Sequence, residues 1–181
     1  MTSKKHDCYY DAMECLCVED YDEAVKLCKK AVKIDEHYVA GYLGLAWAYR
    51  YKGNSKKYEE YTNKAFDETK KRYPKWPKTM LWGYLENREY MRAIQEKANL
   101  YWEQDKLEKV EKLFRLLLKM NPGDNQGIRF LLAGMFTGIS GEDVDDLVDE
   151  ANQKQDWSKI DNLLLEQNKK HKFWEKPSFD E

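Results

Sequence analysis

Four cysteines and one histidine near the start of the chain are the residues whose types could bind a metal ion. Cys8, Cys15, Cys17 and Cys28 follow His6 within the first thirty positions. Thiolate and imidazole are zinc ligands, but the CxxC spacing typical of zinc sites is absent. A helix would also point Cys15 and Cys17 to different sides. We therefore expect reduced thiols, most of them buried as small apolar residues, and no bound metal.

The histidines, which are the side chains most often used in acid–base catalysis, form no catalytic pattern. His6, His37 and His171 are far apart in the sequence, and none lies near a paired carboxylate or serine in a recognisable motif. Neither a GxxxxGK(S/T) nor a GxGxxG segment is present, so no phosphate-binding loop is indicated. We expect no catalytic residue, no cofactor and no enzymatic activity.

A basic segment with interleaved aromatic rings could bind a nucleic-acid strand. Residues 70–78 read Lys-Lys-Arg-Tyr-Pro-Lys-Trp-Pro-Lys, and residues 169–172 add a second basic cluster. Such surfaces contact phosphates and stack bases. However, the chain has a net charge of −2 and lacks a broad positive face. Lysines at the end of a helix also stabilise its dipole, so nucleic-acid binding stays an alternative function.

The composition is that of a folded, mostly helical protein. Apolar residues make up 42% and aromatic residues 14% of the chain, with only 4 prolines and 9 glycines. No run of about 18 apolar residues occurs, so we predict no membrane span. The first residues are charged and lack the apolar stretch of a signal peptide, which predicts a cytoplasmic protein.

Small and apolar residues recur along the chain with a period of 34 residues. The first two sets of positions are Cys8, Ala12, Cys15, Ala24, Cys28 and Ala31, then Tyr42, Ala46, Tyr49, Tyr58, Thr62 and Ala65. The second two sets are Ile94, Ala98, Tyr101, Val110, Phe114 and Leu117, then Ile128, Leu132, Met135, Val144, Val148 and Ala151. This period indicates stacked helical hairpins.

The repeat frame divides the chain into four hairpins. Two occupy residues 5–72, split at residue 38, and two occupy residues 91–158, split at residue 124. Residues 73–90, with Trp76 and Trp82, interrupt the period as a connector, because prolines disfavour helix in the residues before them. We expect a capping helix at 159–174, a frayed tail at 175–181 and one structural domain.

The spacing resembles that of the tetratricopeptide repeat family over residues 5–158. Tyr42, Ala46, Tyr49 and Ala65 match the family's preferred residues in the second hairpin, as Ala98, Tyr101, Phe114 and Pro122 do in the third. Tyr58 and Leu132 are larger than the small residues that the family usually has at those places. The segments 81–93 and 121–129 look like those of small microbial members. The resemblance implies an all-α, right-handed superhelical solenoid of antiparallel helix pairs.

In this family the first helix of each pair usually lines a concave groove that binds a peptide or a partner helix. The corresponding residues here are Tyr9, Met13, Leu43, Trp47, Arg50, Arg92, Gln95, Asn99, Trp102, Gln126, Arg129 and Phe136. Aromatic residues and arginine are enriched at protein interfaces, so the predicted function is a protein-interaction adaptor or scaffold.

Two other arrangements of the same residues remain open. The C-terminal helix could fill the groove and bury Trp47 and Trp102 as core. Alternatively, Trp82, Tyr84 or the pair Phe173 and Trp174 could form the patch of a homo-oligomer. The lysine, asparagine and arginine clamp by which one class of the family holds a chaperone's terminal carboxylate is not complete in this sequence.

Overall fold

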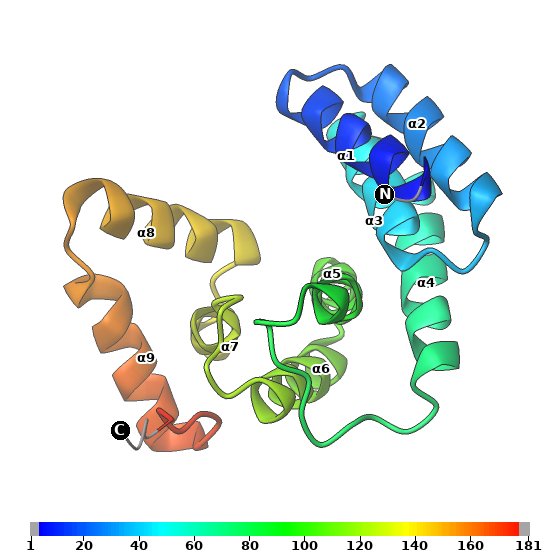
Figure 1. Cartoon of the computed structure of the whole chain (residues 1–181). Coiled ribbons are helices and arrows are strands. Elements are labelled where there is room, and N and C mark those ends of the chain that lie inside the picture. Colours follow the sequence, from blue (N-terminus) through cyan, green and yellow to red (C-terminus); the bar gives the residue numbers. More distant parts are fainter. Residues whose placement is uncertain (1–3, 178–181) are drawn as a thin grey trace. The chain divides into compact units, whose positions relative to one another are not determined.

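The structure is all-α, as predicted. The computed structural model describes residues 4–177 of the chain, and these contain nine helices and no strand (Figure 1). The helices are α1 (Lys4–Cys17), α2 (Tyr21–Ile34), α3 (Val39–Tyr51), α4 (Ser55–Arg72), α5 (Leu85–Glu103), α6 (Leu107–Met120), α7 (Ile128–Thr137), α8 (Gly141–Lys154) and α9 (Ser158–His171). Sequential helices pack together, as α1 does with α2 and α3 with α4, which is consistent with a helical repeat.

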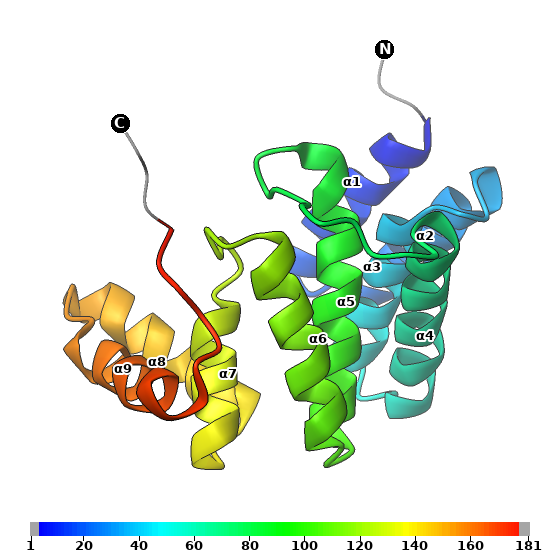
Figure 2. The same ribbon diagram turned by 90° about the horizontal axis from the view of Figure 1, so that it is seen from below.

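Contacts divide the chain into two compact units. Unit 1 consists of Met1–Pro77 and Gly83–Leu100, and therefore holds α1 to α4 and most of α5. Unit 2 consists of Lys78–Trp82 and Tyr101–Glu181, and holds α6 to α9. In unit 2, α9 packs against both α7 and α8 (Figure 2).

Small residues form the centre of unit 1 and allow its helices to approach closely. Ala12 of α1, Ala24 and Cys28 of α2, and Ala46 of α3 are completely buried. They belong to one apolar cluster that also includes Leu100 of α5. The repeat frame predicted small or apolar residues at the first four of these positions, and the structure places all four in the core.

Polar caps fix where the helices of unit 1 begin. The Asp20 carboxylate accepts the backbone N–H of Glu23 at 3.1 Å at the start of α2, and Asn54 does the same for Lys57 at 3.0 Å at the start of α4. Gly53, between α3 and α4, has φ +68°, the left-handed conformation that commonly ends a helix. Each cap satisfies a backbone donor that has no partner within its helix.

In unit 2, Asp124 starts α7 and Ser140 starts α8. The two carboxylate oxygens of Asp124 accept the backbone N–H groups of Ile128 at 2.8 Å and Arg129 at 2.9 Å. Ser140 and Asp143 form a capping box, with each side chain accepting the other's backbone N–H. Asp143, at the acidic start of α8, therefore caps the helix and lies where a negative charge complements the helix dipole.

Two helices differ in length from the repeat frame. Helix α5 begins at Leu85, inside the segment 73–90 that was expected to be a connector, so only residues 73–84 are non-helical. Helix α9 ends at His171 rather than near residue 174, because Lys172 takes the left-handed conformation with φ +48°. Of the tail predicted at 175–181, residues 178–181 lie outside the described part of the chain.

The segment after α9 folds back onto unit 2. The Asn168 side-chain oxygen accepts the backbone N–H groups of Phe173 and Trp174, both at 3.0 Å, and its amide donates to the Trp174 carbonyl at 2.7 Å. The Trp174 indole N–H donates to the carbonyl oxygen of Pro122, which follows α6, at 3.0 Å. Phe173 is buried at the end of this turn.

Candidate partner-binding surface

Two residues of the predicted groove lie in the core of unit 1. Leu43 is completely buried among Val39, Ala65 and Ala93, because α5 packs over this side of α3. Tyr9 is also buried, and its ring packs edge-on against another tyrosine, Tyr38, with the centroids 6.0 Å apart. Burial raises the pKa of the Tyr9 hydroxyl to about 12. Neither side chain is exposed to a partner in this structure.

The remaining groove residues of unit 1 are at least partly exposed. They come from α1, α3 and α5, and we call them the helix-A surface: Met13, Trp47, Arg50, Arg92, Gln95 and Asn99. Arg50 is the most open, with 46% of its side chain accessible. Those of α5 recur at helical spacing, so they occupy one face of that helix.

A buried carboxylate, Glu96, organises the centre of this surface. Its two oxygens accept the indole N–H of Trp47 at 3.0 Å and the hydroxyl of Tyr58 at 2.9 Å. The Arg50 guanidinium donates to the same Tyr58 hydroxyl at 2.9 Å and lies 3.6 Å from Glu96. One side chain of α5 thus connects α3 and α4 and fixes the orientation of the Trp47 ring.

The other predicted groove residues belong to unit 2, where two of them are covered by the chain itself. The Arg129 guanidinium pairs with Asp124 at 2.9 Å and lies over the rings of Phe130 and Trp174. Phe136 stacks on His171, at the end of α9, with ring centroids 3.8 Å apart. In unit 2, the C-terminal helix and the segment after it therefore cover part of α7.

Trp102 and Gln126 complete the predicted set. Trp102 is half-buried and packs edge-on against Phe114 of α6, with ring centroids 6.0 Å apart. Gln126 is half-buried in the turn between α6 and α7. Trp102 therefore contributes to the packing of α6 rather than standing free.

Three cations of the basic segment considered for nucleic acid contact neighbouring side chains of unit 1. The Lys70 ammonium lies 4.6 Å from the centre of the Trp76 ring, and the Arg72 guanidinium lies 5.9 Å from that of Tyr73. Lys71 forms an ion pair with Glu68. These contacts stabilise the end of α4 and the turn after it.

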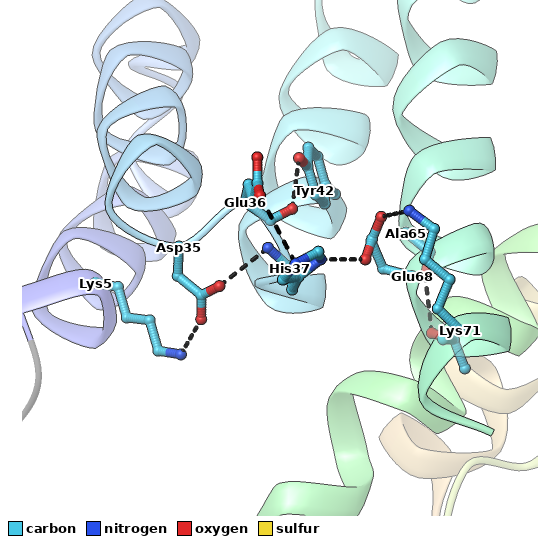
Figure 3. A network of polar contacts seen from close by, with 9 residues as sticks. Lys5, Asp35, Glu36, His37, Tyr42, Ala65, Glu68 and Lys71 are labelled. Atoms are coloured by element: carbon cyan, nitrogen blue, oxygen red, sulfur yellow. Dashed lines mark hydrogen bonds and ion pairs between the residues drawn. The ribbon is translucent and has the colours of Figure 1, made fainter.

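A mixed-charge pocket of about 380 Å³ lies at the helix ends of unit 1. In Figure 3, Lys5 pairs with Asp35, whose other oxygen accepts the His37 backbone N–H at 3.0 Å. The His37 ring lies 2.8 Å from Glu68, which also pairs with Lys71. The hydrogen bond from Lys5 holds the pKa of Asp35 below its usual value. The charges shown are mutually satisfied, so the network ties α1, the α2–α3 turn and α4 together.

Another carboxylate of this pocket, Glu89, has a different environment. It accepts the Ala40 backbone N–H at 3.0 Å, and burial raises its pKa above the ordinary value of a glutamate. Sequence reasoning missed both Glu89 and Glu96, because a glutamate on a charged helix is normally solvated. The only available signal was that Glu96 shares a helix face with Arg92 and Asn99, which had been assigned to the groove.

The cysteines are free thiols in three environments. Cys8 and Cys28 are buried, as expected, whereas Cys15 is only partly buried and Cys17 is exposed. Burial raises the pKa of the Cys28 thiol to about 12, which disfavours the reactive thiolate. Within residues 4–177, no cluster of three or more histidine, cysteine or acidic side chains is arranged to hold a metal ion. None of the helices in the described chain is long and apolar enough to cross a membrane.

The sequence of α2 matches a known family. A model described as a tetratricopeptide repeat matches residues 18–38, which span α2 and the turns on both sides of it. The chain thus carries a tetratricopeptide repeat motif, as the resemblance suggested, in a module that usually has no catalytic function. A search of the curated proteins found no match.

Proposed function

We propose that this chain is a protein-interaction adaptor that binds a peptide or a partner helix over the helix-A surface of unit 1. The observation that carries the proposal is the tetratricopeptide motif at residues 18–38, in a unit where α1 pairs with α2 and α3 with α4. Repeats of this kind generally bind proteins, and their stacking into a right-handed solenoid is part of the proposal.

The chemistry of the helix-A surface supports a polypeptide ligand. Trp47 offers an aromatic face whose orientation is fixed by Glu96, and Arg50 offers a partly exposed guanidinium beside it. Asn99 lies one helical turn from Glu96 on α5 and can exchange hydrogen bonds with a peptide backbone. A rigid aromatic anchor surrounded by polar groups is the usual composition of an interface hot spot.

The test is a selection of peptides against the immobilised full-length chain, followed by calorimetric titration of the best binder. The double variant Arg50→Ala with Asn99→Ala is expected to weaken the binding at least tenfold, about 1.4 kcal/mol. The matched control is Lys29→Ala with Lys30→Ala, which removes two exposed side chains from α2, the second helix of its pair.

Two results would contradict the proposal. One is a selection that yields no peptide above background. The other is a binder whose affinity falls equally in both double variants, or only in the control. Circular dichroism of each variant establishes that the helices are intact, and urea unfolding shows whether Arg50→Ala has loosened the Glu96 network.

A further inference from the structure

A second cleft lies in unit 2, between α6 and the segment that follows α9. Its volume is about 650 Å³, within the range of sites that bind small molecules or short peptides. One wall is formed by Leu118, Lys119 and Pro122 at the end of α6, and the other by residues 172–177. None of the groove residues predicted from the sequence lines it.

Specific hydrogen bonds hold both walls of this cleft in place. Arg115 of α6 donates to the carbonyl oxygens of His171 at 2.9 Å and Lys172 at 3.2 Å, which are orphan acceptors at the end of α9. The three hydrogen bonds of Asn168 and the indole bond of Trp174 to Pro122 fix the chain beyond that point. The cleft is therefore a built feature of unit 2.

The cleft carries an excess of uncommitted positive charge. Lys119, Lys172 and Lys176 line it, and in the part of the chain that the structure describes none of their ammonium groups is paired with a carboxylate. Glu175 is the one acidic residue of the lining. Arg115 is already used by Glu111 at 2.7 Å and by the two carbonyls, so it orders the wall and is not counted among the available cations.

An apolar surface lies beside these lysines. The Trp174 ring is half-buried, and Leu118, Pro122 and Pro177 add apolar side chains to the lining. Ammonium groups around an aromatic and aliphatic wall suit a ligand that has carboxylates on both sides of an apolar side chain. A nucleic-acid strand would need a longer basic track than three lysines in one cleft.

We propose that the cleft between α6 and residues 172–177 binds an acidic peptide segment, with Lys119, Lys172 and Lys176 pairing its carboxylates and Trp174 contacting its apolar side chain. The site is separate from the helix-A surface in residues and in unit. Either proposal can therefore fail while the other holds.

The experiment is a fluorescence anisotropy titration of the full chain into a labelled peptide of one leucine flanked on each side by two glutamates. It is run at 150 mM salt, where the Debye length of about 8 Å limits long-range attraction. The test variant is Lys119→Glu with Lys176→Glu, and the matched control is Lys169→Glu with Lys170→Glu. The control residues are exposed on the last turn of α9, lie outside the lining, and change the net charge equally.

We expect saturable binding that is weakened at least tenfold in the test variant and less than twofold in the control. The double variant Lys119→Ala with Lys176→Ala should also bind more weakly than the control. Because it reverses no charge, it guards against a loss of binding caused by misfolding. The inference is overturned if the anisotropy of the labelled peptide does not saturate as the chain is added, or if both double variants lose binding equally. It is also overturned if a peptide with glutamines in place of the glutamates, or a single-stranded oligonucleotide, binds as tightly.

Discussion

Replacing Gly44 of α3 with alanine tests the close approach of α2 and α3 that defines unit 1. A Cβ at this position would lie 2.4 Å from Cys28 Sγ and 3.1 Å from Met13 Cε. Cys28 is completely buried, so its thiol is surrounded by other protein atoms. The methyl group of Gly44→Ala must therefore displace α3 or force Cys28 from its rotamer.

The size of the effect follows from two opposing contributions. Overpacking a core costs about 1 to 3 kcal/mol. Replacing glycine with alanine inside a helix stabilises the folded state by roughly 1 kcal/mol. We expect Gly44→Ala to lower the free energy of unfolding by about 1 kcal/mol, which in a chain of this length lowers the Tm by roughly 2 to 4 °C.

Replacing Cys28 as well tests whether the contact between Gly44 and Cys28 is the cause of the effect. Cys28→Ala alone removes a buried sulfur and should cost about 1 to 2 kcal/mol, as expected for a small cavity. In the double variant the new methyl group occupies that space. Its stability should therefore return to within about 0.5 kcal/mol of the parent, a coupling of roughly 2 kcal/mol between neighbouring residues.

Urea and thermal unfolding, followed by circular dichroism, measure all four proteins of this cycle. Gly83→Ala is the control, because no atom lies within 4 Å of its added Cβ, and its stability should stay within about 0.5 kcal/mol of the parent. The reasoning is refuted if Gly44→Ala is stabilising, which would be helix propensity acting alone. Simple additivity of the two substitutions would refute it as well.

Three further outcomes are expected. Burial raises the pKa of Glu89 in the folded chain above its value in the unfolded chain. The stability that the neutral acid contributes is therefore lost as the pH rises through the folded pKa. Glu89→Gln should raise the urea midpoint of unfolding at pH 7 and leave it unchanged at pH 3. Hydrogen bonds from Lys57 and then Lys64 lower the pKa of Glu60 to about 2. The stability that the ionised Glu60 contributes is therefore present above about pH 4.5 and is lost as the pH falls towards 2. Because the Glu60 side chain is 37% exposed, Glu60→Gln should lower the free energy of unfolding by about 1 kcal/mol or less at pH 7, and by less still in 1 M salt. Asn168→Ala removes three hydrogen bonds to the segment after α9, so limited trypsin digestion should cut after Lys172 faster than in the parent, with α1 to α6 protected as before. An unchanged rate would show that Trp174 and Arg115 hold the segment alone.

Much of the secondary structure follows from local sequence. Helix α6 (Leu107–Met120) lies within the predicted third hairpin, and its strongly periodic apolar stripe ends at an Asn-Pro-Gly turn. The start of α5 did not match. The repeat frame placed the beginning of that hairpin at residue 91, whereas four of residues 85–90 are Leu, Glu, Arg and Glu, which favour helix, so the helix starts earlier.

The candidate surface was harder to predict, for a different reason. Periodicity tells which residues share a face of a helix, but it does not tell what covers that face. Leu43 and Arg129 occupy equivalent faces of α3 and α7, yet α5 buries the first and the segment around Trp174 covers the second. Those outcomes depend on contacts between residues distant in the sequence, which no local pattern encodes.

The carboxylate of Glu96 carries an implication for how this chain can evolve. A hydrophobic residue there would leave the Tyr58 hydroxyl and the Trp47 indole nitrogen without their acceptor, while losing either donor would remove one of the hydrogen bonds that offset the burial of the carboxylate. Single mutational steps at these three sites are consequently disfavoured. Homologues should either retain Trp47, Tyr58 and Glu96 or have replaced all three together, for example with phenylalanines around a leucine. An alignment would show this as covariation of the three positions.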